Sequence, residues 1–502
     1  MNFRNLAALP VLMAAFHATT GAVPTERNFW PLVVEREHLV TADGRSSRSV
    51  EALGPLAFHQ SMGGPSPSLG GVRPFYFEKR NRDGNLSEAF WFYPLLRYRV
   101  DQNARSWSFV NLINGAFTSP TGVHGTSGVK KLDIWPVYFS RQAEEPGASY
   151  RAVFPLVGSI PQRFGHDRIS WVLFPLYGRF EKRGTTTLTL PWPFIKVLSG
   201  DGHSGFDFWP LYGSREKAGV YRDRFALWPL VYDQVTLNGP NVTGRKTGVL
   251  PFYALEVTEG YRSKTFLWPF FGYVDRTAPY QYHARNYLWP LWVKGRGDAR
   301  QVDRWAPFYS QSVIKGTKKT WVLWPLWREI SWTEGMLAHH RTQLLYFLYH
   351  ADMQRRADGA AVEPASKIHL WPLASGWNNG AGKKQWQVLS PFEVFFPKSD
   401  PVRFSWTPLF ALYRYDQTEP GETRHVALWN AVSLYRKRSE SAVSFHLGPL
   451  VSSERNPRNQ RLAFLGGLVS WQRGAAGSPW RFSFGNFTSG NAGRSSESAA
   501  LP

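Results

Sequence analysis

The chain has 502 residues and no cysteine, and its 59 Lys and Arg residues outnumber 37 Asp and Glu residues to give a formal net charge of +22. The lack of cysteine excludes disulfide bonds, thiol catalysis and cysteine-ligated zinc, so the fold must be held by burial and backbone pairing. The positive charge indicates anionic partners, but the basic residues are spread along the chain without the dense cluster typical of a nucleic-acid-binding arm.

The first 22 residues have the pattern of a secretory signal peptide. Arg4 supplies a positive charge, residues 6–15 form an apolar run, and the small residues at 20–22 suit a cleavage site. A membrane anchor is the alternative, but the apolar run is interrupted by Pro10 and is too short to span a bilayer. We therefore expect an exported protein whose mature chain begins near Val23 and crosses no membrane with a helix.

One short motif, Leu-Trp-Pro-Leu followed by an aromatic or aliphatic residue, recurs along the chain. The clearest copies are FWPLV at 29–33, FYPLL at 92–96, IWPVY at 134–138, LFPLY at 173–177, FWPLY at 208–212, LWPLV at 227–231, LWPFF at 267–271, LWPLW at 288–292 and 323–327, and LWPLA at 370–374. Degenerate copies lie between them, among them GPLAF from 54, LPFYA from 250, SPFEV from 390 and TPLFA from 407.

The motif has a period of about 19 residues. Consecutive motif prolines between Pro136 and Pro325 are 17 to 22 residues apart, and copies without proline fit near 111–115, 344–349, 428–432, 465–469 and 482–486. The whole chain then contains about 23 to 24 units. A repeat of this kind predicts one repeat-built domain over residues 23–487, followed by a disordered Gly, Ser and Ala-rich tail at 488–502.

The composition of each unit predicts β structure. Trp, Tyr, Phe, Val and Thr flank the motif, proline interrupts any helix, and the connections at 181–184, 238–241 and 295–298 carry turn residues. Hairpin turns favour an antiparallel meander, while a β-solenoid with one unit per coil is the competing interpretation. If residues 264–276 form one strand, both of its faces are apolar at the centre, over an apolar band of about nine residues.

An export signal, an even strand number near 24 and abundant aromatic residues resemble, in outline, a bacterial outer-membrane β-barrel. A large closed barrel is therefore the first expectation for the fold. Three features argue against it: apolar residues on both faces, proline in the middle of the expected strand, and a polar tail instead of a final aromatic strand. The alternative is an elongated two-layer repeat sheet in which each unit bends at its proline.

These features predict a non-enzymatic protein of a Gram-negative-type cell envelope, located in the outer membrane or else in the periplasm or at the cell surface. The barrel interpretation gives a pore or a structural protein. The alternative gives a soluble repeat protein that binds membrane lipid, lipopolysaccharide or an acidic glycan, and nucleic acid is not an expected partner.

No motif predicts a catalytic, cofactor or metal site. His339, His340, His350 and Asp352 lie close in sequence but lack the spacing of a zinc signature. Residues 202–205, Gly-His-Ser-Gly, are followed by a strand rather than a helix, which argues against a nucleophile elbow. Residues 380–384 lack the spacing of a phosphate-binding loop and predict a basic turn.

The 23 tryptophans are the other candidates for function, because indole rings bind sugars and lie at membrane interfaces. The motif tryptophans, Trp209, Trp228, Trp268, Trp289 and Trp324, lie at the apolar centre of their units. We therefore expect them to form the core of the repeat.

Overall fold

The computed structural model of the protein describes residues 25–489, except 40–45, 63–66, 120–127, 146, 360–361, 475–477 and 486. The expected signal peptide at 1–22 and most of the expected tail lie outside the described residues.

The described chain forms one 46-stranded antiparallel sheet. Each strand pairs with its neighbours in the chain, from β1 (Thr25–Phe29) on β2 (Val33–Leu39) to β45 (Arg481–Phe484) on β46 (Phe487–Ser489). The predicted all-β antiparallel meander is thus confirmed. Two helical elements, η2 and α1, interrupt it near residue 400.

Each repeat contains two strands rather than one. Residues 264–276, expected to be a single strand, contain the end of β25 (Tyr261–Phe266), a turn, and β26 (Phe271–Arg276). The turn reverses the chain, so Phe266 pairs with Phe271. The 46 strands therefore form 23 hairpin units, and the expectation of a continuous apolar strand through the motif is wrong.

The motif itself forms the turn of each hairpin. In the unit at 267–270 the amide of Phe270 donates to the carbonyl of Leu267 at 2.9 Å, and the peptide bond before Pro269 is cis. Because Pro269 lies outside the strands, it removes no hydrogen bond from the sheet.

The meander gives the sheet two different long edges. The turns from odd-numbered to even-numbered strands lie at one edge, and nearly all of them carry the motif or a degenerate copy of it; we call this the apolar edge. The turns from even to odd strands form the polar edge, for example between β16 (Tyr177–Lys182) and β17 (Thr185–Thr189). Glycines with left-handed φ, such as Gly184 and Gly316, occupy these polar turns because glycine adopts φ > 0 at no steric cost.

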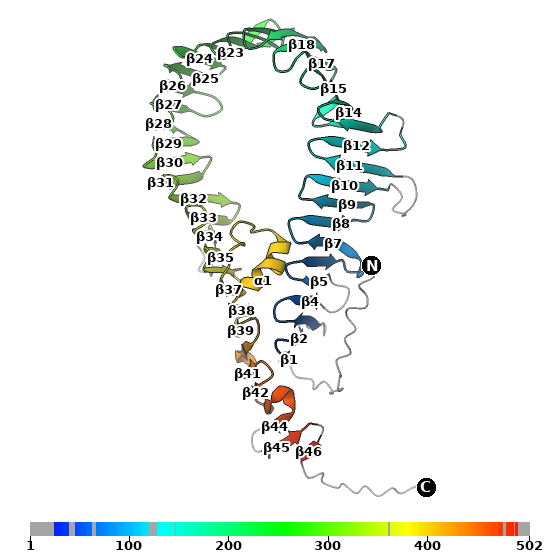
Figure 1. Cartoon of the computed structure of the whole chain (residues 1–502). Helices are drawn as coiled ribbons and strands as arrows, with labels where there is room; N and C mark the ends of the chain where they lie inside the picture. The colour runs from blue at the N-terminus through cyan, green and yellow to red at the C-terminus, as the bar shows by residue number, and fades with distance from the viewer. Residues whose placement is uncertain are drawn as a thin grey trace, which may run out of the picture.

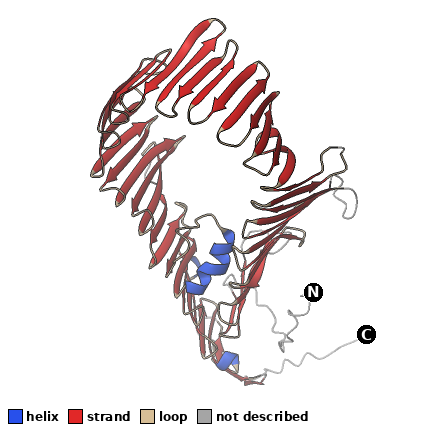
Figure 2. Cartoon of the chain, turned by 45° about the horizontal axis from the view of Figure 1, so that its top comes forward, coloured by secondary structure: helices blue, strands red, loops and turns tan. Residues whose placement is uncertain are grey.

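The long ribbon of strands bends into a loop whose two ends converge (Figure 1, Figure 2). Among the described residues, β1 pairs only with β2 and β46 only with β45, so the sheet does not close edge to edge. Most strands have five or six residues, and all but β23 (Asn241–Val249) are shorter than the 9 to 11 that a bilayer-spanning strand needs. The closed barrel that we expected first is therefore not what the described residues form; they form an open, elongated sheet.

A helical insertion at 389–412 replaces one turn of the apolar edge and crosses the loop. It lies between β37 (Lys384–Val388) and β38 (Tyr413–Glu419) and contains the π-helix η2 (Val402–Trp406) and the short α1 (Thr407–Phe410). The stretches at 390 and 407 that we expected to be strand repeats belong to this insertion. Figure 1 shows it between the two arms of the ribbon.

The insertion packs on the N-terminal arm through aromatic rings and hydrogen bonds. Phe404 stacks on Phe77 of β6 (Tyr76–Arg80) with ring centroids 6.1 Å apart. Trp406 Nε1 donates to the carbonyl of Tyr93 at 3.2 Å, and Arg73 Nε donates to the carbonyl of Phe404 at 2.8 Å. These contacts join two arms of the ribbon that are far apart in sequence.

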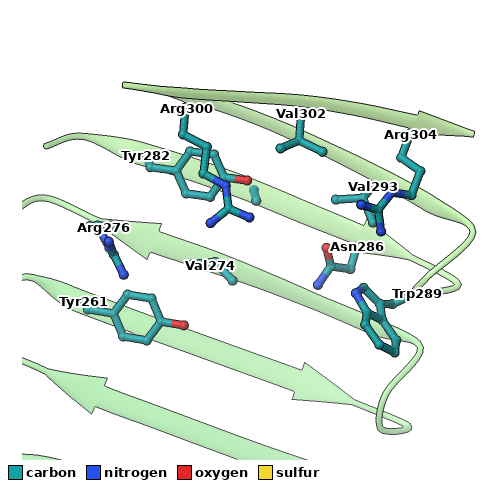
Figure 3. A pocket seen from close by; sticks show the side chains of 11 residues that line it. Tyr261, Val274, Arg276, Tyr282, Asn286, Trp289, Val293, Arg300, Val302 and Arg304 are labelled. Carbon is teal, nitrogen blue, oxygen red and sulfur yellow. The ribbon is translucent and has the colours of Figure 1, made fainter. Parts of the chain in front are cut away.

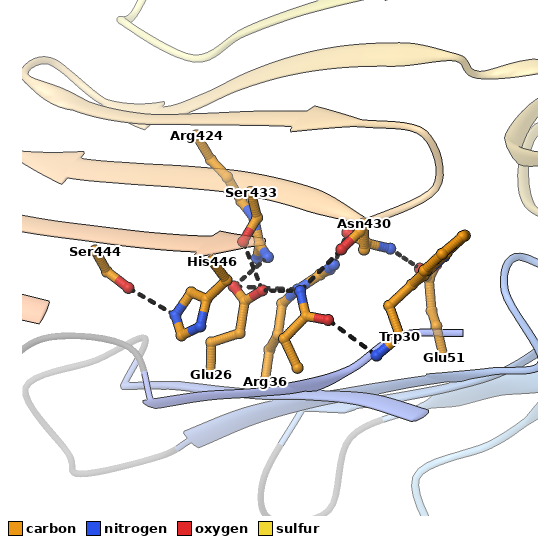
Figure 4. Close-up of polar contacts among 10 residues, drawn as sticks. Glu26, Trp30, Arg36, Glu51, Arg424, Asn430, Ser433, Ser444 and His446 are labelled. Carbon is orange, nitrogen blue, oxygen red and sulfur yellow. Dashed lines mark hydrogen bonds and ion pairs between the residues drawn. The ribbon is translucent and has the colours of Figure 1, made fainter. Parts of the chain in front are cut away.

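The two ends of the ribbon also meet face to face through buried charges (Figure 4). Glu26 of β1 accepts hydrogen bonds from Arg424 Nη2 and Ser433 Oγ, both at 2.7 Å. Asn28 Nδ2 donates to the carbonyl of Asn430 at 2.8 Å, and Asn430 also bonds Arg36 and Glu51. We call this set of contacts the junction.

Burial alone would raise the pKa of Glu26, but Arg424 and Arg36 outweigh it and lower that pKa to about 2. Burial lowers the pKa of His446, which also faces Glu26 and bonds Ser444 at 2.8 Å. The junction therefore holds an ionised carboxylate and a neutral histidine at neutral pH.

Cross-strand register defines an inner face, which carries Glu26 and Phe77 and faces into the loop. Small apolar clusters lie on this face, one formed by Phe58, Phe77 and Phe90 and another centred on Ile160 and Trp171. The opposite, outer face carries the alternate residues of each strand. No helix within the described ranges is long and apolar enough to cross a membrane.

Candidate functional site

The apolar edge is exposed along the ribbon. The motif tryptophans Trp209, Trp228, Trp268, Trp289 and Trp324 have exposed fractions of 36% to 59%. They lie in turns at the rim of the sheet, so the expectation that they form the core of the repeat is wrong. In the sequence these tryptophans lie at the centre of an apolar run. Because the chain reverses at that point, the centre of the run lies in a turn at the edge of the sheet.

Successive turns of this edge are joined by backbone hydrogen bonds. The amide of Leu323 donates to the carbonyl of Phe308 in the preceding turn at 2.7 Å, and the amide of Trp324 donates to the carbonyl of Pro307 at 2.8 Å. The same pattern joins the turns at 250–252 and 267–268. The exposed side chains therefore stand on a continuous, ordered wall rather than on separate loops.

Leucine occupies a left-handed position in many of these turns. The φ angles of these leucines lie between 44° and 65°, a region where bulky side chains are rare and glycine is favoured. They are Leu53, Leu173, Leu227, Leu267, Leu288, Leu323, Leu345, Leu389, Leu428 and Leu465. Most of them are about half exposed, so neither burial nor backbone geometry accounts for a leucine at this position.

A row of large apolar residues on the outer face borders the same edge. Cross-strand pairs next to the turns include Phe266 with Phe271, Tyr287 with Trp292, and Trp305 with Tyr309. Further pairs in this row are Phe29–Val33, Trp91–Leu96, Phe109–Ile113, Phe208–Tyr212, Val322–Trp327, Leu344–Tyr349 and Leu447–Val451. The row widens the apolar edge into a band.

Basic residues lie beyond this band on the outer face. Lys264 of β25, Arg285 of β27 (Tyr282–Tyr287) and Lys294 of β28 (Trp292–Gly297) are two positions from the aromatic row. Among the residues that the structure describes, none of these three forms an ion pair. On β25, β27 and β28 cations therefore lie one row above the apolar rim, while Asp303 occupies the same row on β29, opposite Lys294. Apolar side chains at a rim with cations above them are found in proteins that lie at a membrane surface.

A depression of about 280 Å³ lies on the inner face over β25 to β29 (Arg300–Trp305) (Figure 3). Arg276, Arg300 and Arg304 line it, together with Tyr261, Tyr282, Asn286 and Trp289 and the apolar residues Val274, Ala284, Val293 and Val302. No acidic residue lines it. Three arginines and no carboxylate make this concave site positively charged.

Aromatic rings position two of the three arginines. The Arg276 guanidinium lies 5.0 Å from the ring centre of Tyr261, and its Nη1 donates to Tyr280 Oη at 2.9 Å. The Arg300 guanidinium lies 4.9 Å from the ring centre of Tyr282. Stacking on a ring leaves the planar N–H edge of a guanidinium free to bind an anion.

The floor of the depression depends on Gly295 of β28. A Cβ at this position would come within 2.3 Å of Tyr282 Oη, so only glycine lets the Tyr282 ring lie flat across the sheet. Tyr282 is 5% exposed, and burial raises the pKa of its hydroxyl. The tyrosine therefore stays neutral beneath Arg300.

The histidines singled out in the sequence do not converge. His339 stacks on Trp332, His340 bonds Ser331 at 2.9 Å, and His350 bonds Asp352 at 3.1 Å. His340 lies on the face opposite to His339 and His350. Among the described residues no three histidine or acidic side chains come together as metal ligands would.

The two glycine-rich stretches are turns of the polar edge. Gly202 lies in the turn before β19 (His203–Phe208), and His203 hydrogen-bonds Tyr221 at 2.9 Å. In the stretch at 380–384, Asn379 Oδ1 accepts hydrogen bonds from the amides of Ala381 and Lys383.

A comparison with models of protein families finds no match for this chain. A comparison with curated proteins finds no significant similarity. The apolar edge and the arginine-lined depression are therefore interpreted from their own chemistry.

Proposed function

We propose that this protein is an exported, non-enzymatic protein of a bacterial cell envelope that rests on a lipid leaflet with its apolar edge. The observation that carries the proposal is the row of exposed leucines at left-handed turn positions. Glycine would relieve the backbone at each of these positions, so stability of the fold does not account for leucine there. An apolar surface that inserts among lipid acyl chains does account for it.

Charge and shape favour a lipid leaflet as the occupant of this edge. Lys264, Arg285 and Lys294 lie one row above the apolar band, where the phosphates of anionic lipids would lie. A second copy of the chain would bring its own cations to the same place, because the net charge of each chain is +22. All described strands except β23 are shorter than a bilayer-spanning strand, which favours a peripheral position over a pore.

Flotation with vesicles tests the proposal. The purified protein is mixed with vesicles of phosphatidylglycerol and phosphatidylethanolamine, some of which carry brominated acyl chains, and is separated on a density gradient. We expect the protein to float and its tryptophan emission to be quenched by the brominated lipid, because the motif tryptophans enter the acyl region. Failure to float, or flotation without quenching, would contradict insertion of the edge.

A further inference from the structure

Three arginines open into the inner-face depression without an acidic partner. Arg276 comes from β26, and Arg300 and Arg304 come from β29. The carboxylates nearest to them in sequence are engaged elsewhere. Asp275 contacts His283 Nδ1 at 2.8 Å and Asp303 pairs with Arg296 at 2.6 Å, both on the outer face, and Asp298 accepts from the amide of Gln281 at 3.3 Å. Within the described ranges no carboxylate neutralises the three guanidiniums, so the site suits a multiply charged anion.

The positive groups lie at two ends of the depression. Arg276 and Arg300 lie at one end, and Arg304 lies with Asn286 and Trp289 at the other (Figure 3). Arg300 and Arg304 are four residues apart on one strand, which separates their backbones by about 13 Å. A ligand that contacts both ends must therefore carry anionic groups at two separate positions.

The surface between the two ends is made of apolar side chains and of the Tyr282 ring, which lies across Gly295. The apolar side chains are Val274, Ala284 and Val302, and the indole of Trp289 borders the surface. Surfaces of this kind accept the C–H face of a sugar ring, which an aromatic side chain also binds. A small inorganic anion would leave this surface uncovered.

We infer that the depression over β26 to β29 binds a sugar that carries phosphate groups at two positions. Phosphate suits three guanidiniums better than a single carboxylate does, because each phosphate carries up to two charges and accepts paired N–H donors from arginine. The sugar is either free or the head group of a phosphorylated glycolipid. The site lies on the inner face, so this inference does not depend on the apolar edge.

Calorimetric titration with glucose 1,6-bisphosphate tests the inference on the full chain. We expect saturable binding, and a loss of affinity of about tenfold or more in Arg300→Gln and in Arg304→Gln, because each removes charged hydrogen bonds to the ligand. Arg285→Gln and Lys294→Gln are matched controls, since they remove cations of the neighbouring strands from the outer face. We expect the controls to bind within twofold of the wild type.

Other probes decide what the site recognises. Equal affinity for inorganic phosphate and the bisphosphate would show that the site does not recognise the sugar. Binding of polygalacturonate in place of the bisphosphate would show that the site recognises carboxylates and not phosphates. Arg300→Gln and Arg304→Gln variants that fold, as judged by circular dichroism, and bind like the wild type would overturn the site itself. Vesicles that carry a bisphosphorylated disaccharide lipid separate the two sources, because Arg304→Gln weakens binding to them only if a head group reaches the site.

Discussion

The two long edges of the ribbon are built from turns of the same sheet, yet they expose different side chains to water. Large apolar side chains recur in the turns of the apolar edge, whereas few lie in the turns of the polar edge, such as Phe164 and Met336. The polar edge uses glycine at left-handed positions, as at Gly184 and Gly316, with charged or amide neighbours. The apolar edge places leucine at φ angles of 44° and 48°, as at Leu267 and Leu323, which match Arg183 and Lys315, the charged residues before those two glycines. The polar edge shows that these hairpins fold with ordinary turn residues, so the composition of the apolar edge reflects what it contacts.

Introducing charged residues at each edge should give the largest difference in vesicle affinity between the two edges. In the double variant Trp268→Glu, Trp289→Glu we expect vesicle affinity to fall by about a hundredfold or more, because two carboxylates would have to enter the acyl region. The matched variant Asn238→Glu, Asn241→Glu adds the same charge to the polar edge and should retain most of the affinity. Flotation measures both, and equal losses in the two variants would remove the distinction between the edges.

The junction holds the ribbon in its bent form, and so it also determines the curvature of the apolar edge. Weakening the junction is therefore a second test. Glu26→Gln leaves Arg36 and Arg424 without their counter-charge, and we expect a loss of about 3 kcal/mol of stability at the junction. Chemical denaturation of the variant measures this loss. Ser433→Ala, which removes one neutral donor to Glu26, should cost about 1 kcal/mol.

Acid should open the same junction. The pKa of Glu26 is about 2 in the closed form against an ordinary value of 4.5, so its contribution is present above pH 4.5 and is lost as the pH falls from 4.5 towards 2. The lowered pKa of His446 acts in the same direction, because an opened junction takes up a proton below about pH 6.5 that the closed form excludes. Spin labels on Arg27→Cys of β1 and on Arg455→Cys of β42 (Val451–Asn456), which pairs with the strand of His446, should move apart on acidification. Separation on raising the pH instead would contradict this account.

Exchanging leucine and glycine between the edges tests the argument from backbone angles. We expect Leu267→Gly with Leu288→Gly to leave the melting temperature unchanged or slightly higher and to weaken vesicle binding severalfold. The reverse change at the polar edge, Gly316→Leu, should cost about 1 to 2 kcal/mol and leave vesicle binding unchanged. A large loss of stability in the leucine variants would show that the fold itself requires those side chains.

Salt should have the smallest effect. Raising ionic strength screens Lys264, Arg285 and Lys294 from anionic head groups, and we expect a decrease of a fewfold in affinity for phosphatidylglycerol vesicles. Binding to neutral vesicles should not change. A complete loss of binding in salt would mean that charge, and not the apolar edge, holds the protein on lipid.

Much of the fold could be predicted from the sequence, because the repeat period and the turn residues are local signals. The expected 23 to 24 units correspond to 23 hairpins, and units without proline, as at 344–349, were placed correctly. The motif was misinterpreted because an apolar run such as Phe266 to Phe271 satisfies the pattern of a strand buried on both faces. The proline in it was the signal for a turn.

The candidate site was harder to predict than the fold. Arg276, Arg300 and Arg304 are separated in sequence, and only the register of β26 to β29 brings them to one face. The spacing of Arg300, Val302 and Arg304, each two residues from the next, was the local sign that these three side chains share one face of a strand. The insertion at 389–412 could not be expected, because its Pro-Phe and Pro-Leu pairs match the repeat, and its role depends on contacts with Phe77 and Tyr93 more than 300 residues away.

Because every described strand pairs only with its neighbours in the chain, each hairpin can form locally, without waiting for a distant segment. Each unit adds about 10 Å to the ribbon, so gain or loss of one unit would change the circumference of the loop by a fixed step. The insertion and the junction residues would then lie opposite other strands than those they now contact. The number of hairpins therefore sets the circumference of the loop, and the contacts of the insertion and of the junction fit only one such number.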